Sequence, residues 1–291
     1  MNEIRVNAGE VKLQVRDYPS TGPAIVFLHF SGANLMMWQR VVPYFQERYR
    51  VVLVDLRGHG KSDAPEGGYH MDVMAQDVIA VLDQLGIEKA HIVGSSLGAE
   101  VGLSLAANHP ERVISLILDG AMNSEYGPYG LWEGTAQEFE QHVAAQLEKI
   151  RNAPEVSFPT LEAFLETRQT MYEKYDWWNP YVADMERYGA RKLPDGSFTK
   201  GFSKQSNAAY MQNYFQYRFE EYYPKVQCPI LMLMNKELEE GREKEVILGL
   251  KELAVNAEIG EVEGWEHPYL WMLDPDNACK VIKLWLGRSE I

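Results

Sequence analysis

One short stretch, residues 94–98, has the residue types and spacing of a nucleophilic serine. Its sequence, Gly-Ser-Ser-Leu-Gly, fits the pattern Gly-x-Ser-x-Gly with Ser96 at the centre. An apolar run over 90–93 precedes it and a predicted helix over 99–108 follows, which is the strand-turn-helix context that the pattern requires. So tight a turn strains the serine backbone and exposes its hydroxyl, and glycine on both sides avoids collisions with the neighbouring elements. We therefore predict that Ser96 is a nucleophile.

Ser96 needs a general base, because a serine hydroxyl is a weak nucleophile at neutral pH. The sequence has seven histidines, and His267 lies just beyond the last predicted strand, residues 259–262. A loop at that place belongs to the carboxyl edge of a parallel sheet, the same edge as Ser96. We predict His267 as the base. His29 and His59 are expected to stabilise loops by hydrogen bonds instead.

The elements that must position these residues alternate between strand and helix. Short apolar or alternating runs predict strands at 11–15, 24–28, 51–54, 90–93, 114–118, 229–234 and 259–262. Helical spacing predicts helices at 36–45, 72–85, 99–108, 242–253 and 277–286. The order favours an α/β fold, a doubly wound and mostly parallel sheet of about eight strands.

An insertion interrupts this order. Residues 123–223 contain no predicted buried strand and read as helical, with a turn signal at 192–197. We predict a core domain of residues 1–122 and 224–291 and a helical cap of residues 123–223. Its many aromatic side chains suit walls for an apolar or aromatic substrate: Tyr126, Tyr129, Trp132, Phe139, Trp177, Trp178, Tyr181, Tyr210, Tyr214, Phe215, Tyr217 and Phe219.

Two further motifs, in the same order as in a known family, make a resemblance clear. Residues 27–32 read Phe-Leu-His-Phe-Ser-Gly and residues 55–63 read Asp-Leu-Arg-Gly-His-Gly-Lys-Ser-Asp. With residues 94–98 they resemble the α/β-hydrolase superfamily over nearly the whole chain outside the insertion. The resemblance implies that the backbone N–H groups of Ser31 and Leu97 form an oxyanion hole. The sequence departs from the family at Phe30, where glycine is usual.

The resemblance also implies a catalytic triad, in which an acidic side chain orients the histidine, but it does not identify that acid. The family most often places an aspartate shortly after the strand that begins near Pro229, where this chain has Leu238. Counting back from the next predicted helix favours Glu239, with Glu237 as an alternative. Asp119, at the end of an earlier strand, is the third candidate, because the alternation of side chains along that strand places the site-facing position one residue away from it. Glutamates before a helix are also explained by favourable interaction with its amino terminus.

The composition of the chain argues against several classes of binding partner. The formal net charge of -14 argues against nucleic acid and against an anionic membrane surface. The chain has two cysteines, no run typical of a signal peptide, and no segment of membrane-spanning length, so a cytoplasmic protein is expected. No residues are spaced like metal ligands, and residues 94–98 lack the lysine of a phosphate loop. We predict a small-molecule substrate, no metal and no cofactor, while the oligomeric state stays open.

These residues predict a serine hydrolase that acts through an acyl-enzyme on a small apolar or aromatic carboxylic ester. A serine at position 96 argues against the dehalogenases and epoxide hydrolases of the family, which use aspartate there. Carbon–carbon bond hydrolysis of a diketone, or lactone opening, is an alternative on the same residues. A small-molecule sensor with little turnover is the alternative outside enzymology.

Overall fold

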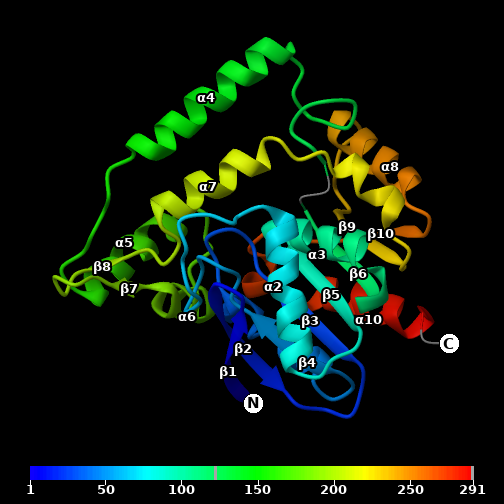
Figure 1. The fold of residues 1–291 in the computed structure, drawn as a ribbon, viewed down its shortest axis with the longest axis horizontal. Coiled ribbons are helices and arrows are strands. Elements are labelled where there is room, and N and C mark those ends of the chain that lie inside the picture. The colour runs from blue at the N-terminus through cyan, green and yellow to red at the C-terminus, as the bar shows by residue number, and fades with distance from the viewer. Residues whose placement is uncertain (121–122, 290–291) are drawn as a thin grey trace.

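An eight-stranded sheet in the order β1-β2-β4-β3-β5-β6-β9-β10 organises the computed structural model, which describes residues 1–120 and 123–289 (Figure 1). Strand β2 runs antiparallel to both of its neighbours, and the pairs from β4 to β10 are parallel. The predicted fold class is confirmed. The strands are β1 (Asn2–Ala8), β2 (Val11–Tyr18), β3 (Ala24–Leu28), β4 (Arg50–Val54), β5 (Ala90–Ser95), β6 (Val113–Asp119), β9 (Ile230–Asn235) and β10 (Ala257–Val262).

Helices cover both faces of this sheet. The core helices are η1 (Leu35–Trp38), α1 (Val42–Phe45), α2 (Met71–Gln84), α3 (Leu97–Asn108), η2 (Pro110–Arg112), α8 (Arg242–Leu253), α9 (Leu270–Leu273) and α10 (Asp276–Ser289). The single helix predicted over 36–45 is two short pieces, η1 and α1. Pro43 lies in the first turn of α1, and proline has no N–H to continue the hydrogen-bond ladder of a preceding turn.

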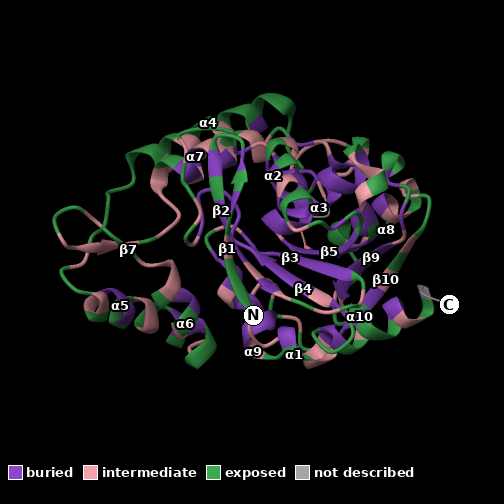
Figure 2. Cartoon of the chain, turned by 60° about the horizontal axis from the view of Figure 1, so that its bottom comes forward, coloured by how far each residue is buried: buried purple, intermediate pink, exposed green. Residues whose placement is uncertain are grey.

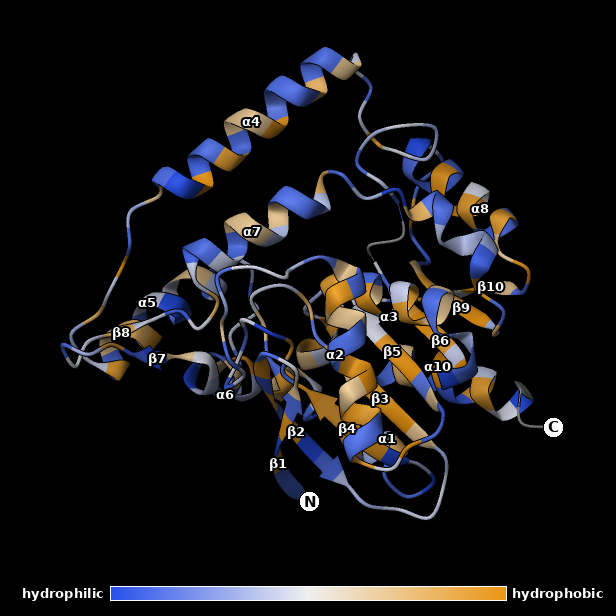
Figure 3. Cartoon of the chain, viewed as in Figure 1, coloured by the Kyte–Doolittle hydropathy of each residue, from blue (hydrophilic) through white to orange (hydrophobic). Residues whose placement is uncertain are grey.

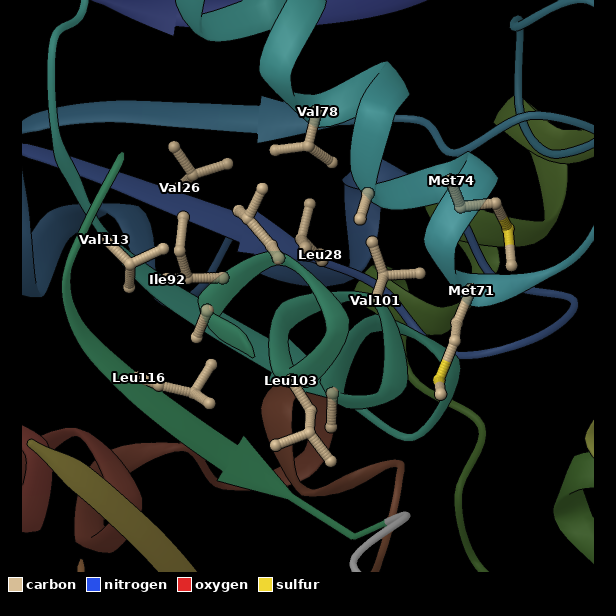
Figure 4. Close-up of a cluster of buried hydrophobic side chains, with 14 of the residues drawn as sticks. Val26, Leu28, Met71, Met74, Val78, Ile92, Val101, Leu103, Val113 and Leu116 are labelled. Atoms are coloured by element: carbon tan, nitrogen blue, oxygen red, sulfur yellow. The ribbon is translucent and has the colours of Figure 1, made fainter. Parts of the chain in front are cut away.

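Strand β3 shows how the sequence divides the core between the two faces. Val26 and Leu28 belong to the cluster on the side of α2 and α3, whereas Ile25 and Phe27 belong to the cluster on the side of α1 and α10. Figure 4 shows part of the first cluster, with side chains from the strands meeting those from α2 and α3. Each fully buried aliphatic side chain there contributes about 1.5–3 kcal/mol. Helix α3 is buried from Leu97 to Ala107, so the segment that follows Ser96 is fixed on all sides.

Residues 123–223, hereafter the inserted segment, lie between β6 and β9 in the chain and outside the main sheet (Figure 1). The segment contains α4 (Ala136–Asn152), α5 (Leu161–Glu173), α6 (Pro180–Gly189), β7 (Arg191–Lys192), β8 (Phe198–Thr199), α7 (Lys204–Tyr214) and η3 (Phe219–Glu221), and η4 (Tyr223–Lys225) closes it. The predicted turn at 192–197 joins β7 to β8, with Leu193 N donating to Ser197 O at 2.7 Å. Residue 122, on the predicted boundary, falls outside the described residues.

The two parts of the chain differ in burial. The strands of the sheet are largely buried, while α4 is mostly exposed (Figure 2) and mostly hydrophilic (Figure 3). Helix α4 buries Phe139 alone of its described residues, and a capping box between Thr135 and Glu138 stabilises its start. Its main packing partner is α7. Within residues 1–120 and 123–289, no helix combines the length and the apolar character needed to cross a membrane.

Candidate active site

Ser96 lies at the junction of β5 and α3 in a backbone conformation that L-residues rarely adopt. Its φ is 49° and its ψ is -117°, and among the described non-glycine residues only Asp176 shares a positive φ. A Cβ on Gly94 would collide with the backbone of Gly98, and a Cβ on Gly98 would collide with the backbone of Leu28. These contacts explain why both flanking positions are glycine. The strain of such a residue costs on the order of 1–3 kcal/mol, which the buried elements around it offset.

The backbone of Ser96 is also tied to the neighbouring strand. Its N–H donates to the carbonyl oxygen of Asp119 at 2.8 Å, and its own carbonyl accepts from Ala99 and Glu100 in α3. Ser96 is partly exposed, whereas Ser95 and Leu97 on either side are fully buried. The turn therefore presents one residue, Ser96, at the carboxyl edge of the sheet.

Asp119, the last residue of β6, is the carboxylate paired with His267. Its Oδ1 lies 2.8 Å from His267 Nδ1, and its Oδ2 accepts from Ser95 Oγ and Trp271 Nε1, both at 2.6 Å. The carboxylate is fully buried. Three donors thus face its two oxygens and hold it in one orientation, which fixes the imidazole of His267 in turn.

The expectation that Glu239 pairs with His267 is wrong in this structure. Glu239 and Glu237 are both exposed in the loop after β9, and Leu238 between them packs partly against the core. The physical reason for the error is a register shift between β5 and β6. Ala90 pairs with Val113 but His91 pairs with Ser115, so Ile114 is skipped. This irregularity shifts the alternation of β6 by one residue and turns Asp119 toward the site.

His267 combines burial with a charged partner. Burial lowers its pKa, but the charge and the hydrogen bond of Asp119 raise it by more, so the net pKa is above the ordinary value of 6.5. Its ring stacks on Trp265, with centroids 5.9 Å apart, and lies so close to Gly120 that a Cβ there would collide with the imidazole. Gly120, with φ of 71°, therefore has a steric role directly after Asp119.

The loop after β3 carries Ser31, one of the two expected oxyanion donors. Ala33 N donates to Phe30 O at 3.1 Å and Gly32 has φ of 85°, so residues 30–33 form a tight turn with Ser31 at its second position. Phe30, where the family pattern has glycine, is 6% exposed and packs edge-on against Tyr269 with centroids 5.3 Å apart. The larger side chain is accommodated by that aromatic contact. Leu97, the other expected donor, begins α3, where the backbone N–H has no acceptor within the helix.

The two histidines predicted to be structural are buried and hydrogen-bonded. His29 Nε2 accepts from Leu56 N at 3.0 Å and its Nδ1 lies 2.8 Å from Phe30 O, and burial lowers the pKa of His29 to about 4. His59 Nδ1 lies 2.9 Å from Arg57 O, and its ring stacks on Phe202 of the inserted segment at 4.0 Å. These contacts fix the turns after β3 and β4.

A cavity of about 290 Å³ lies beside the expected oxyanion loop. Phe30, Ser31 and Tyr269 line it from the core, and α5 and α6 line it from the inserted segment. Its aromatic residues from that segment are Phe164, Tyr172 and Phe202, none of which is among the aromatics singled out from the sequence. Most of the latter pack on one another, as Phe139 does on Tyr126 and Trp132.

Two donors to Asp119 were missed by sequence reasoning. Ser95 lies inside the Gly-x-Ser-x-Gly pattern, and its pairing with Asp119 follows from the strand register. Trp271 follows His267 by four residues, and α9 begins only at Leu270, so the sequence carried no clear signal for this contact. No three His, Cys, Asp or Glu side chains in the described parts of the chain gather as a metal site would require.

Comparison with known proteins identifies the family. Residues 23–233 match the family described as alpha/beta hydrolase fold. The chain belongs to the alpha/beta hydrolase family. It is 41% identical over 115 residues to 3-oxoadipate enol-lactonase 2 of Acinetobacter baylyi, which covers 40% of this chain and 43% of that protein. It is 45% identical over 97 residues to pimeloyl-[acyl-carrier protein] methyl ester esterase of Aeromonas hydrophila, covering 33% of this chain and 37% of that protein.

Each of these alignments spans about two fifths of the curated relative or less. The likeness in structure extends further. A thermophilic esterase from Thermogutta terrifontis superposes with a TM-score of 0.72 at 19% identity, with 100% of both chains covered. The match over residues 23–233 shows the family, and the structural similarity shows the fold over the whole chain.

Proposed function

We propose that this α/β hydrolase is a serine hydrolase that cleaves a small carboxylic ester through an acyl-enzyme on Ser96. The observation that carries the proposal is the conformation of Ser96, directly after β5. The neighbouring strand β6 ends at the buried Asp119, which is paired with His267. The names of the relatives, which include an enol-lactonase and a methyl ester esterase, support the same class of reaction.

In the proposed reaction, Asp119 holds the proton on Nδ1 of His267, which leaves Nε2 as the base. As Ser96 Oγ forms a bond to the carbonyl carbon, its proton moves to His267. His267 then gives this proton to the leaving alcohol as the carbon–oxygen bond breaks. Water, deprotonated by His267 in the same way, releases the acid and restores Ser96.

The N–H groups of Leu97 and Ser31 would bind the oxyanion in this scheme. Leu97 starts α3, so its N–H carries the partial positive charge of a helix amino terminus. Removal of one such donor in related chemistry costs on the order of 10²–10³ in kcat. We also propose that the inserted segment acts as a cap, because it supplies one wall of the cavity beside Ser31.

The test is a rapid-mixing experiment with 4-nitrophenyl butyrate and intact-mass measurement of the protein. We expect a burst of nitrophenol and a butyryl adduct on the wild-type protein, with both lost in Ser96→Ala. Ser197→Ala, in the turn between β7 and β8, is the matched control and should keep both. Adduct formation that survives Ser96→Ala would refute the assignment, and tight ligand binding with no turnover would favour a sensor.

A further inference from the structure

The cavity beside Ser31 contains more positive than negative charge, in a chain whose net charge is -14. Arg168 from α5 and Lys200, just before α7, line it, and Glu186 from α6 is the carboxylate among its lining residues. Apolar and aromatic groups make up much of the remaining wall. A small cavity with aromatic walls and one excess cation suits an organic anion.

Arg168 is held in place by the protein but is not fully paired. Its Nη2 donates to Glu186 Oε1 at 2.7 Å and to Tyr172 Oη at 3.1 Å, and its guanidinium lies over the Tyr172 ring. Its Nε is buried and has no hydrogen-bond partner, and its side chain is 13% exposed. Glu186 and Tyr172 engage only Nη2, so the guanidinium of Arg168, which lines the cavity, keeps further N–H donors for an acceptor of a ligand.

Lys200 adds a second cation. In the described residues 1–120 and 123–289 it makes no ion pair or hydrogen bond of its own. Partial removal from water lowers the pKa of Lys200 and the charge of Arg168 lowers it further, while the charge of Glu186 offsets part of this effect. An anion bound in the cavity would relieve this repulsion, since it would attract both cations. Glu186 is already engaged by Arg168 and Tyr172.

The cavity lies next to loops that belong to the candidate active site. Its lining includes Ser31, on the loop that follows β3, and Tyr269, two residues after His267. Strand β3 is the neighbour of β5, which ends at Ser96. The cavity therefore borders the loop that carries Ser31 and the loop that carries His267, although Ser96 itself is not among its lining residues.

We propose that Arg168 and Lys200 form a carboxylate-binding subsite, and that the substrate is an ester or lactone carrying a carboxylate at the end away from the scissile carbonyl. This inference rests on the proposed function of Ser96 and narrows its substrate class. Hydrogen bonds to charged groups contribute about 1.5–3 kcal/mol, so loss of the carboxylate contact should lower kcat/KM by about tenfold or more.

The first test compares two substrates of the same shape, the mono-4-nitrophenyl ester of adipic acid and its terminal primary amide. We expect kcat/KM to be about tenfold or more higher for the acid, mostly through KM, because the subsite binds ground state and transition state alike. Lys200→Glu should reduce this ratio to below one. Arg168→Lys keeps the charge but loses the planar fork of guanidinium donors, and should reduce the ratio by less.

Lys192→Glu is the matched control, since it makes the same charge change on β7, outside the cavity lining. It should leave the ratio within about twofold, because Lys192 does not line the cavity and solvent screens its charge from a ligand bound there. An acid-to-amide ratio near one in the wild-type protein, or equal effects of Lys200→Glu and Lys192→Glu, would overturn the subsite.

A binding measurement keeps this inference separate from the proposed chemistry. Monomethyl adipate should raise the melting temperature of Ser96→Ala, and the increase should be lost in the double variant with Lys200→Glu. If no ester is turned over but this increase is present, the proposed function fails and the subsite stands. If inorganic phosphate gives the same increase as the carboxylate, the subsite is a general anion site and the substrate assignment is wrong.

Discussion

Two of the fully buried carboxylates differ in the groups that donate hydrogen bonds to them. Asp119 lies at the carboxyl edge of the sheet, and Glu100 lies beneath the inserted segment. Asp119 faces Ser95, Trp271 and His267. Glu100 accepts from Tyr210 of α7 at 2.6 Å through one oxygen, and its other oxygen has no partner. Burial raises the pKa of Glu100 to about 8.

The difference separates two kinds of contact. At the sheet edge, both oxygens are committed, so the carboxylate can orient a histidine and stabilise its charge. At the contact between α3 and α7, a neutral carboxyl is the stable form near neutral pH, so this contact depends on pH. One contact of the inserted segment with the core, Tyr210 to Glu100, is therefore sensitive to pH, whereas the donors Ser95 and Trp271 that hold Asp119 both belong to the core.

The largest expected effect concerns the sheet edge. Asp119→Asn should lower kcat for 4-nitrophenyl butyrate by up to about 10⁴-fold, because the amide cannot hold His267 in the required tautomer. Glu239→Gln, in the exposed loop after β9, should change kcat by less than about twofold. The two variants are compared by steady-state kinetics with circular dichroism to check folding. A larger loss in Glu239→Gln than in Asp119→Asn would reverse the assignment.

The next effect concerns the contact with α7. The unfolded chain releases the Glu100 proton near 4.5 and the folded chain near 8, so stability falls as pH rises between these values. At pH 7 the shifted pKa lowers the free energy of unfolding by about 3 kcal/mol relative to pH 4.5. Glu100→Gln should therefore melt higher than wild type at pH 7, and the two should converge near pH 4.5. Glu88→Gln, at an exposed position, should follow wild type at every pH.

A smaller effect is expected in the pH profile of catalysis. His267 must be neutral to accept a proton, so kcat/KM should fall as pH decreases through its raised pKa. In Asp119→Asn, burial remains but the attraction of the carboxylate is lost, so the midpoint of the residual activity should move to lower pH. The charge of Glu243 also raises the pKa of His267, but by less than Asp119 does, so Glu243→Gln should shift the midpoint by less. Equal shifts in both variants would argue against a specific pair.

The smallest effect tests a second contact of the inserted segment. Tyr188 in α6 donates to Asp55 Oδ2 at 2.9 Å, and loss of one such bond costs about 1 kcal/mol. Tyr188→Phe should make limited proteolysis in the turn 192–197 about fivefold faster, with little change in the global melting temperature. Tyr175→Phe, at a side chain that is 63% exposed, is the control. Unchanged cleavage would show that this bond does not hold the segment.

The sheet, most core helices and the Ser96 turn could be predicted because each has a local signal. Buried parallel strands are continuous apolar runs, and α8 extends over the residues predicted for it. Strand β1 was missed, since Val6 and Ala8 are its only buried residues and the alternation is short.

The partner of His267 could not be predicted in the same way. The bulge at Ile114 changes which face Asp119 occupies, and nothing local in the sequence of β6 reveals a register shift against β5. The cavity was missed for a related reason. Its residues come from six separate stretches of chain, and spacing along one helix does not show which side chains meet across several.

The location of Asp119 in β6 also has a consequence for protein engineering. Residues 236–241 follow β9 and are exposed except for Leu238, and neither the His267 pair nor the Ser96 turn depends on them. This loop is a suitable attachment point: a peptide tag or a fluorescent reporter joined after Glu239 should leave the hydrolase folded and Ser96, the proposed nucleophile, reactive.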